Sequence, residues 1–256
     1  MASYLFGQLT DPNINALYRH FDYFIDLSLD MHWNLQTNKL YVDNIELPNI
    51  THGFIRGNVF EEQTEQKYAN YYLISNYLRH NSKTYNKDFH GETPFKIKDL
   101  MLAKKIGLNV PHTEVTKCAT TLKETIIKPI TGGAHAAIGR EASYSAIIQQ
   151  RIRGKNKRLF VVNTEPFCFE IISSMIDYRE DTETYVKLSD ISFGHIEKIK
   201  KLMTKLNLTF GAADFMVDNN NKHWFLEINT MPMFAAFDLK VNGLLSKTIH
   251  SELVRL

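Results

Sequence analysis

The sequence predicts a mixed α/β fold in which a small N-terminal unit precedes two lobes of strands and helices. Short apolar runs mix with helical patterns along residues 3–86, β segments alternate along residues 159–229, and an amphipathic helix interrupts these at 192–206. With 256 residues, 44% hydrophobic and 23% charged, the chain is long enough to bury a substantial core.

The first 86 residues have the pattern of a small α/β unit. We expect strands at 4–6, 24–27, 40–42 and 53–56, and helices at 13–21 and 61–80. No catalytic motif occurs in this part, so its expected role is to shape one wall of a cleft.

A second lobe is predicted to follow. A helix is expected at 96–107, because Leu100, Met101, Ala103 and Ile106 form one apolar stripe that ends at Gly107. An apolar strand at 125–129 then leads into a loop of small residues at 131–139, and the segment Ile147-Ile-Gln-Gln-Arg-Ile152 follows before the β-rich part.

The third part is predicted to be mainly β. Strands are expected at 159–162 and 167–172, and in the helix at 192–206 the apolar side chains face inward while the lysines stay solvated. These patterns divide the chain into three expected domains, 1–88, 89–150 and 151–256.

Oxygen-bearing side chains lie on a predicted β-hairpin in the third part. Alternation along a strand at 224–229 places Glu227 and Asn229 on one face, and Asp214, which begins the stretch 214–218, is expected to close one short strand beside them. Carboxylate and amide oxygens suit Mg²⁺, which keeps sites for phosphate oxygens. The alternative is an ordinary hairpin with a polar face, in which Lys or Arg balances Glu227.

Composition excludes several classes of function. A net charge of +2 and a pI near 8.3 are too mild to indicate nucleic-acid binding. Cys118 and Cys168 show no pairing pattern and are expected to be core thiols in a reducing compartment. No signal-peptide pattern or membrane-length apolar run occurs, so we expect a cytoplasmic protein with no membrane partner.

The order of these features resembles the ATP-grasp carboxylate–amine ligases. A lysine opens a helix, a second lysine ends a strand before a glycine loop, and Gln-Gln-x-Ile, a strand arginine and Asp…Glu-x-Asn follow. The sequence is similar to ligases that add glutamate to a ribosomal protein and to graspetide ligases that macrocyclise microviridin-type peptides. The resemblance covers about residues 85–238, and the first eighty residues match only in kind, as a pre-grasp α/β domain.

The resemblance assigns nucleotide-binding roles to several residues. It implies that Lys96 and Lys128 hold ATP phosphates. Without the resemblance, the sequence around Lys96 would indicate an ordinary lysine on the face of a helix. It implies that a loop with small residues covers the triphosphate and that the hinge between the lobes binds adenine. The residues matching these two elements are Gly132 and Gly133 in the loop, and Gln149, Gln150 and Ile152 in the hinge. Many relatives carry Glu at the position of Gln150.

Two arginines match positions that face the transferred phosphate or another anionic group. Arg158 enters the strand at 159–162, and Arg179 ends a segment that is similar to the Ser-x-x-x-Asp-Trp-Arg pattern of graspetide ligases, with Tyr178 in place of Trp. A structural salt bridge is an equal alternative for both. With Lys128, these arginines form the expected catalytic set.

The implied reaction is ATP-dependent activation of a carboxylate to an acyl phosphate, followed by attack of an amine or hydroxyl. The implied cofactors are ATP and Mg²⁺, with two ions expected and Mn²⁺ as an alternative metal. A peptide or protein tail is the expected substrate, and a homo-oligomer is compatible with the sequence. Graspetide ligases usually continue after Glu-x-Asn with Pro-Asn-Gly-Gln, whereas this chain has Thr230-Met231-Pro232. A regulatory pseudo-enzyme and a small-molecule kinase remain alternatives.

Overall fold

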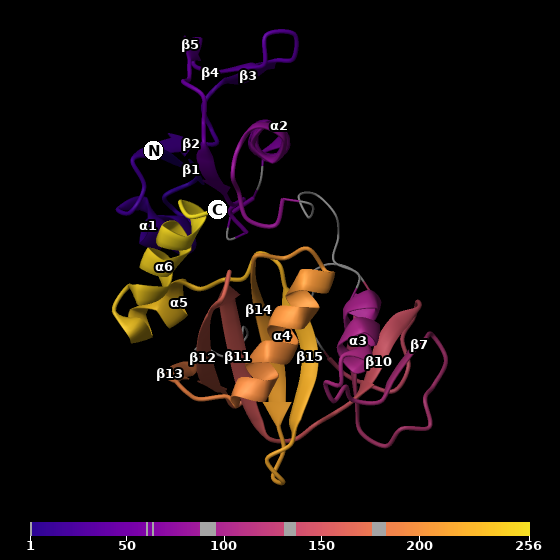
Figure 1. Cartoon of the computed structure of the whole chain (residues 1–256). Helices are drawn as coiled ribbons and strands as arrows, with labels where there is room; N and C mark the ends of the chain where they lie inside the picture. The colour runs from indigo at the N-terminus through magenta and orange to yellow at the C-terminus, as the bar shows by residue number, and fades with distance from the viewer. Residues whose placement is uncertain (1, 60, 63, 88–95, 131–136, 176–182) are drawn as a thin grey trace. The chain divides into compact units, whose positions relative to one another are not determined.

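The computed structural model describes residues 2–59, 61–62, 64–87, 96–130, 137–175 and 183–256, which form two compact units (Figure 1). The first unit contains Met1–Gly91, Asn207–Thr209 and Met233–Leu256, and the second contains Glu92–Leu206 and Phe210–Pro232. The three domains expected from the sequence remain a prediction. The compact units group the chain differently, because residues 233–256 belong with the N-terminal part.

A parallel sheet forms the centre of the first unit. Its strand order is β2 (Tyr23–Asp26), β1 (Ser3–Gly7), β6 (His52–Ile55), and β1 is buried along its whole length. Helix α1 (Pro12–Tyr18) connects β1 to β2. The Asp11 side chain caps α1 by accepting from the Asn13 backbone N–H, and Pro12 at its start has no N–H to satisfy.

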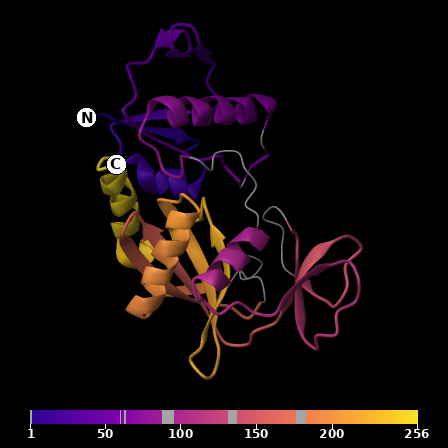
Figure 2. The same ribbon diagram turned by 45° about the vertical axis from the view of Figure 1, so that its right-hand side comes forward.

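A three-stranded antiparallel meander and a helix complete this unit's main core. The meander consists of β3 (Met31–Asn34), β4 (Lys39–Val42) and β5 (Ile45–Glu46), and the helix is α2 (Glu65–Asn81), drawn along its length in Figure 2. Apolar side chains from the sheet, the meander and α2 form one buried cluster: Tyr4, Phe6, Leu27, Met31, Leu40, Val42, Ile50, Ile55, Ile74, Tyr77 and Leu78.

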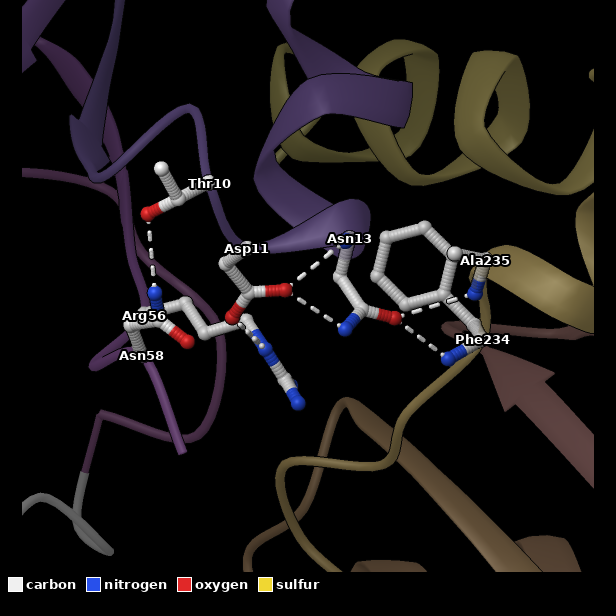
Figure 3. A network of polar contacts seen from close by, with 7 residues as sticks. All are labelled: Thr10, Asp11, Asn13, Arg56, Asn58, Phe234 and Ala235. Atoms are coloured by element: carbon white, nitrogen blue, oxygen red, sulfur yellow. Dashed lines mark hydrogen bonds and ion pairs between the residues drawn. The ribbon is translucent and has the colours of Figure 1, made fainter. Parts of the chain in front are cut away.

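The C-terminal helices α5 (Ala235–Asp238) and α6 (Leu244–Leu253), with the short 3₁₀ helix η2 (Leu239–Val241) between them, pack beside α1. A buried polar network fixes this arrangement (Figure 3). The Asn13 side-chain oxygen accepts from the backbone N–H groups of Phe234 at 2.7 Å and Ala235 at 2.9 Å. Asp11 also pairs with Arg56 at 2.9 Å, and both side chains are at most 2% exposed.

Two antiparallel sheets form the second unit. The smaller has the order β7 (Thr113–Thr116), β10 (Ala146–Gln150), β8 (Thr125–Lys128), β9 (Ala137–Ile138). The larger has the order β13 (Tyr185–Leu188), β12 (Glu165–Ile172), β11 (Lys155–Val162), β14 (Phe210–Val217), β15 (His223–Asn229).

Helices α3 (Lys96–Lys105) and α4 (Phe193–Lys205) lie side by side against one face of the larger sheet (Figures 1 and 2). Ile199, Leu202 and Met203 of α4 are buried, as the amphipathic pattern predicts. Met101, predicted on the buried stripe of α3, is 57% exposed instead. The buried residues of α3 are Asp99, Leu100 and Ala103.

One of the two cysteine predictions is wrong. Cys168 lies buried in β12, where burial raises the pKa of its thiol to about 11, but Cys118 is exposed in the connection between β7 and β8. Through the described part of the chain, the helices are all too short or too polar to cross a membrane.

Candidate nucleotide and metal site

The predicted hairpin brings three oxygen-bearing side chains together. β14 and β15 pair with Asp214 opposite Glu227 and Ala212 opposite Asn229. Asn229 donates from Nδ2 to Asp214 Oδ2 at 3.0 Å, which leaves its Oδ1 as the atom with metal-ligand character. Asp214 does not close its strand as expected, because pairing continues to Val217 after a register shift between Asp214 and Phe215.

Arg158 forms an ion pair with the carboxylate of Asp214. These residues lie opposite each other on β11 and β14, with distances of 2.7 Å from Nε to Oδ1 and 2.8 Å from the second guanidinium nitrogen to Oδ2. The side chains are 6% and 11% exposed. This two-bond geometry is the strong form of an arginine–carboxylate pair. The salt bridge considered for Arg158 is therefore present.

Glu227 is paired with a lysine from α3. Lys96 Nζ lies 3.5 Å from Glu227 Oε2, and the two side chains are 16% and 25% exposed. Burial by itself raises the pKa of Glu227. The charges of Lys128, Lys96 and Arg158 outweigh that effect and hold the pKa below its ordinary value of 4.5. The carboxylate is therefore ionised at neutral pH.

Lys128 and Gln149 form a polar chain on the smaller sheet. Lys128, at the end of β8 as predicted, donates from Nζ to Gln149 Oε1 at 3.1 Å, and Gln149 Nε2 donates to Thr113 Oγ1 at 3.0 Å. Gln149 is 2% exposed, Gln150 is exposed at the end of β10, and Ile152 is half-buried just beyond it. The two glutamines thus differ sharply in their environment.

Three predicted site residues, Gly132, Gly133 and Arg179, lie outside the described residues. Two residues of this region were missed by sequence reasoning. Thr113 orients Gln149, and Asp99 is a 5% exposed carboxyl on α3, one turn after Lys96. Burial, with a smaller effect of Glu227 opposed by Lys98, raises the pKa of Asp99 to about 7. The detectable signal was an acidic residue next to the apolar stripe of α3.

The charges of the cluster favour an anionic ligand. Lys96, Lys128 and Arg158 supply three positive charges against the two carboxylates of Asp214 and Glu227. Among the described residues no group of three His, Cys, Asp or Glu side chains could hold a metal. Two carboxylates and one amide oxygen nevertheless fit Mg²⁺, which typically takes only one or two protein carboxylates.

The chain is similar to known proteins in its fold, although the sequence comparisons found no match. No family model matches the sequence, and the search of curated proteins gave no match. Among solved structures, the ligase PsnB bound to a minimal precursor superposes with a TM-score of 0.80 at 17% identity, covering 99% of this chain and 98% of that chain. The chain has the ATP-grasp fold.

Two further ATP-grasp structures support this assignment. The macrocyclase MdnC with precursor peptide MdnA, from Microcystis aeruginosa MRC, gives a TM-score of 0.72 at 15% identity, covering 99% of this chain and 100% of MdnC. D-alanine–D-alanine ligase from Bacillus anthracis gives 0.65 at 13% identity, covering 99% and 95%. The ATP-grasp fold predicted from the sequence is confirmed, and the roles of individual site residues stay predictions.

Proposed function

We propose that this protein is an ATP- and Mg²⁺-dependent ligase that activates a carboxylate as an acyl phosphate and couples it to an amine or hydroxyl of a peptide or protein. The observation that carries the proposal is the cluster of Lys96, Arg158, Asp214, Glu227 and Asn229 on an ATP-grasp fold. Its positive balance suits a triphosphate, and its oxygen atoms suit the accompanying metal.

Lys96 and Lys128 are the residues assigned to the ATP phosphates. Their compact ammonium groups bind phosphate oxygens as point charges. The side-chain amide of Gln149 is held at both ends, by Lys128 and Thr113, and Gln150 and Ile152 follow at the end of the strand. We assign these three residues to the adenine side of the nucleotide, and Gly132 and Gly133 to the phosphate loop.

Asp214, Glu227 and Asn229 are assigned to Mg²⁺. When bound, Mg²⁺ neutralises charge on phosphate oxygens. Arg158 contacts both carboxylate oxygens of Asp214, which are the atoms that would also hold Mg²⁺. We therefore expect Arg158 to give up at least one of these bonds and to turn toward the transferred phosphoryl group. Arg179 is assigned to a second anionic group of the substrate.

The proposed chemistry needs no protein nucleophile. A substrate carboxylate oxygen attacks the γ-phosphorus, the bond to ADP breaks, and an acyl phosphate forms. The nitrogen or oxygen of the acceptor then attacks the acyl carbon and loses its proton, and inorganic phosphate leaves. The protein's part is to position the reactants and to offset developing negative charge through Lys128, Arg158 and Arg179.

Known structures of the same fold support a peptide substrate. PsnB has been solved with a minimal precursor, Mg and ADP, and MdnC with a precursor peptide. The Thr230-Met231-Pro232 sequence after Asn229 departs from the usual graspetide pattern, so we extend the proposed substrates to protein tails. A cytoplasmic location and a homo-oligomeric state remain predictions.

Incubation with Mg-ATP, pooled amino acids and peptides containing Glu, Asp, Lys, Ser and Thr tests this function. We expect ADP and phosphate, with loss of water from a peptide for macrocyclisation or gain of an amino acid for tailing, both detected by mass spectrometry. A phosphorylated product without free phosphate would indicate the kinase instead. Nucleotide binding without ADP formation would indicate the pseudo-enzyme.

Substitutions in the site sharpen this test. We expect Lys128→Ala and Glu227→Gln each to reduce ADP formation by at least about 100-fold, because each removes a charge or ligand from the phosphates. Lys123→Ala, an exposed lysine between β7 and β8, should turn over like the wild type. Circular dichroism should show that all three variants fold. Undiminished turnover in both site variants would contradict the assignment.

A further inference from the structure

Positive charge is concentrated on two neighbouring helices. α3 and α4 carry eight lysines and only two carboxylates, Asp99 and Glu197, which is a formal charge of +6 in a chain whose total is +2. The remaining residues are therefore net negative, by four charges. The mild overall pI conceals this asymmetry, which the sequence alone indicated only as a solvated lysine face.

The two helices that carry these lysines are neighbours in the fold. α3 and α4 lie side by side (Figure 2), and Lys198 of α4 donates to the carbonyl oxygen of Gly107, just beyond α3, at 2.7 Å. Because their apolar sides pack inward, both helices turn lysines to solvent. We define the basic face by its five exposed lysines: Lys98, Lys104, Lys105, Lys201 and Lys205.

The basic face is not neutralised by the described residues. Lys200 pairs with Glu197 at 3.1 Å, but no described carboxylate lies within ion-pair distance of the five lysines that define the face. Lys201 and Lys205 stand one helical turn apart, a spacing at which like charges destabilise a helix. An anionic partner would relieve this repulsion, which solvent and salt relieve only in part.

We propose that the basic face docks an acidic segment of the peptide or protein substrate, outside the residues that react. This inference rests on the proposed ligase function for the identity of the partner. The first residue of α3 is Lys96, which contacts Glu227, and Lys98 of the basic face lies two residues on. A substrate held along α3 therefore has one end beside the candidate site.

The side chains favour a peptide over nucleic acid or membrane. Proteins that bind single strands interleave basic residues with stacking aromatics, but Phe193 and His195 are the only residues of α3 and α4 with an aromatic ring, and neither helix contains arginine. A membrane-surface helix needs an exposed apolar side. Here Leu100, Ala103 and the inward side chains of α4 are buried, and the two exposed apolar side chains, Met101 and Phe193, are on different helices and do not form one apolar side.

Binding to the full chain without ATP tests the proposal. The probe is a fluorescein-labelled peptide of alternating Glu and Ser, the comparison peptide carries Gln in place of Glu, and anisotropy is followed at low and physiological salt. We expect the Glu peptide to bind at least about tenfold more tightly, with affinity falling as salt rises. Charge reversal by Lys104→Glu, Lys105→Glu, Lys201→Glu and Lys205→Glu together should reduce its affinity at least about tenfold.

The matched control reverses four exposed lysines elsewhere: Lys117→Glu, Lys123→Glu, Lys155→Glu and Lys247→Glu. It changes net charge equally and should retain binding. Replacement of the same four lysines, Lys104, Lys105, Lys201 and Lys205, by Gln should also weaken binding, and covers the case in which charge reversal unfolds the protein. Equal binding of both peptides, or equal loss in the control, would overturn the proposal.

Two competitors identify the class of partner. A mixed-sequence single-stranded oligonucleotide and vesicles containing phosphatidylserine should each bind the basic face more weakly than the Glu peptide. Tighter binding of either would overturn the peptide assignment. ADP formation is measured separately on the wild type. Peptide binding without ADP formation would contradict the ligase function and leave the docking surface supported. ADP formation by the wild type, with unaltered peptide binding by the charge-reversed variant, would support the ligase function and contradict the docking surface.

Discussion

At the scale of single residues, the candidate site is a set of ion pairs that the sequence could indicate only as separate residues. Asp214 and Glu227 were recognisable because alternation places them on one face of a hairpin. Their partners were not, since Arg158 reaches Asp214 across 56 residues and Lys96 reaches Glu227 from a helix. Residue type predicts what a side chain can bind, whereas the partner follows from strand order.

The Arg158–Asp214 pair should be important for stability as well as for activity. Arg158→Met leaves a buried carboxylate without its partner and should lower the free energy of unfolding by about 3–5 kcal/mol. Adding Asp214→Leu removes that charge too, and should restore most of the loss. Urea denaturation of the wild type, both single variants and the double variant measures the coupling. A single-variant loss below about 1 kcal/mol would show that the pair is not structurally important.

At the scale of elements, a glycine lies at the start of the strand pairing that builds the site. Gly154 precedes β11, and its φ of +157° lies in a region that side chains rarely adopt. A Cβ atom there would lie 2.0 Å from the carbonyl oxygen of Val217 at the end of β14. This close approach accompanies the pairing of Lys155 with Val217, the same register that places Arg158 opposite Asp214.

Gly154→Ala should therefore disturb the larger sheet. Because the new methyl group meets backbone rather than a flexible side chain, we expect a loss of more than about 1 kcal/mol in the free energy of unfolding, together with reduced ADP formation. Gly194→Ala is the matched control. Gly194 lies in the first turn of α4, and a methyl group added there would meet nothing within 4 Å, so its replacement should be neutral or slightly stabilising. Equal stability of the two variants would argue against the register role.

At the scale of the whole molecule, the sequence predicted the classes of element better than their grouping. The helix expected at 192–206 occurs as α4, and the strands of the hairpin occur as β14 and β15, because periodicity is a local signal. The packing of residues 233–256 with the N-terminal unit was missed. It depends on Asn13, whose backbone partners lie 221 and 222 residues away and leave no local pattern.

Asn13→Ala tests that long-range closure. The substitution leaves the N–H groups of Phe234 and Ala235 without their acceptor, in a place where Phe234 is fully buried, and should lower the stability of the first unit by at least about 2 kcal/mol. Each unit contains one tryptophan, Trp33 in the first and Trp224 in the second. In a Trp224→Phe background, Trp33 fluorescence should therefore report the loss as a lower urea midpoint. Asn15→Ala, on the exposed side of α1, should leave that midpoint unchanged. If Asn13→Ala behaved like Asn15→Ala, the C-terminal helices would be held by contacts other than those of Asn13, such as the hydrogen bond from Tyr85 to the carbonyl oxygen of Ile249.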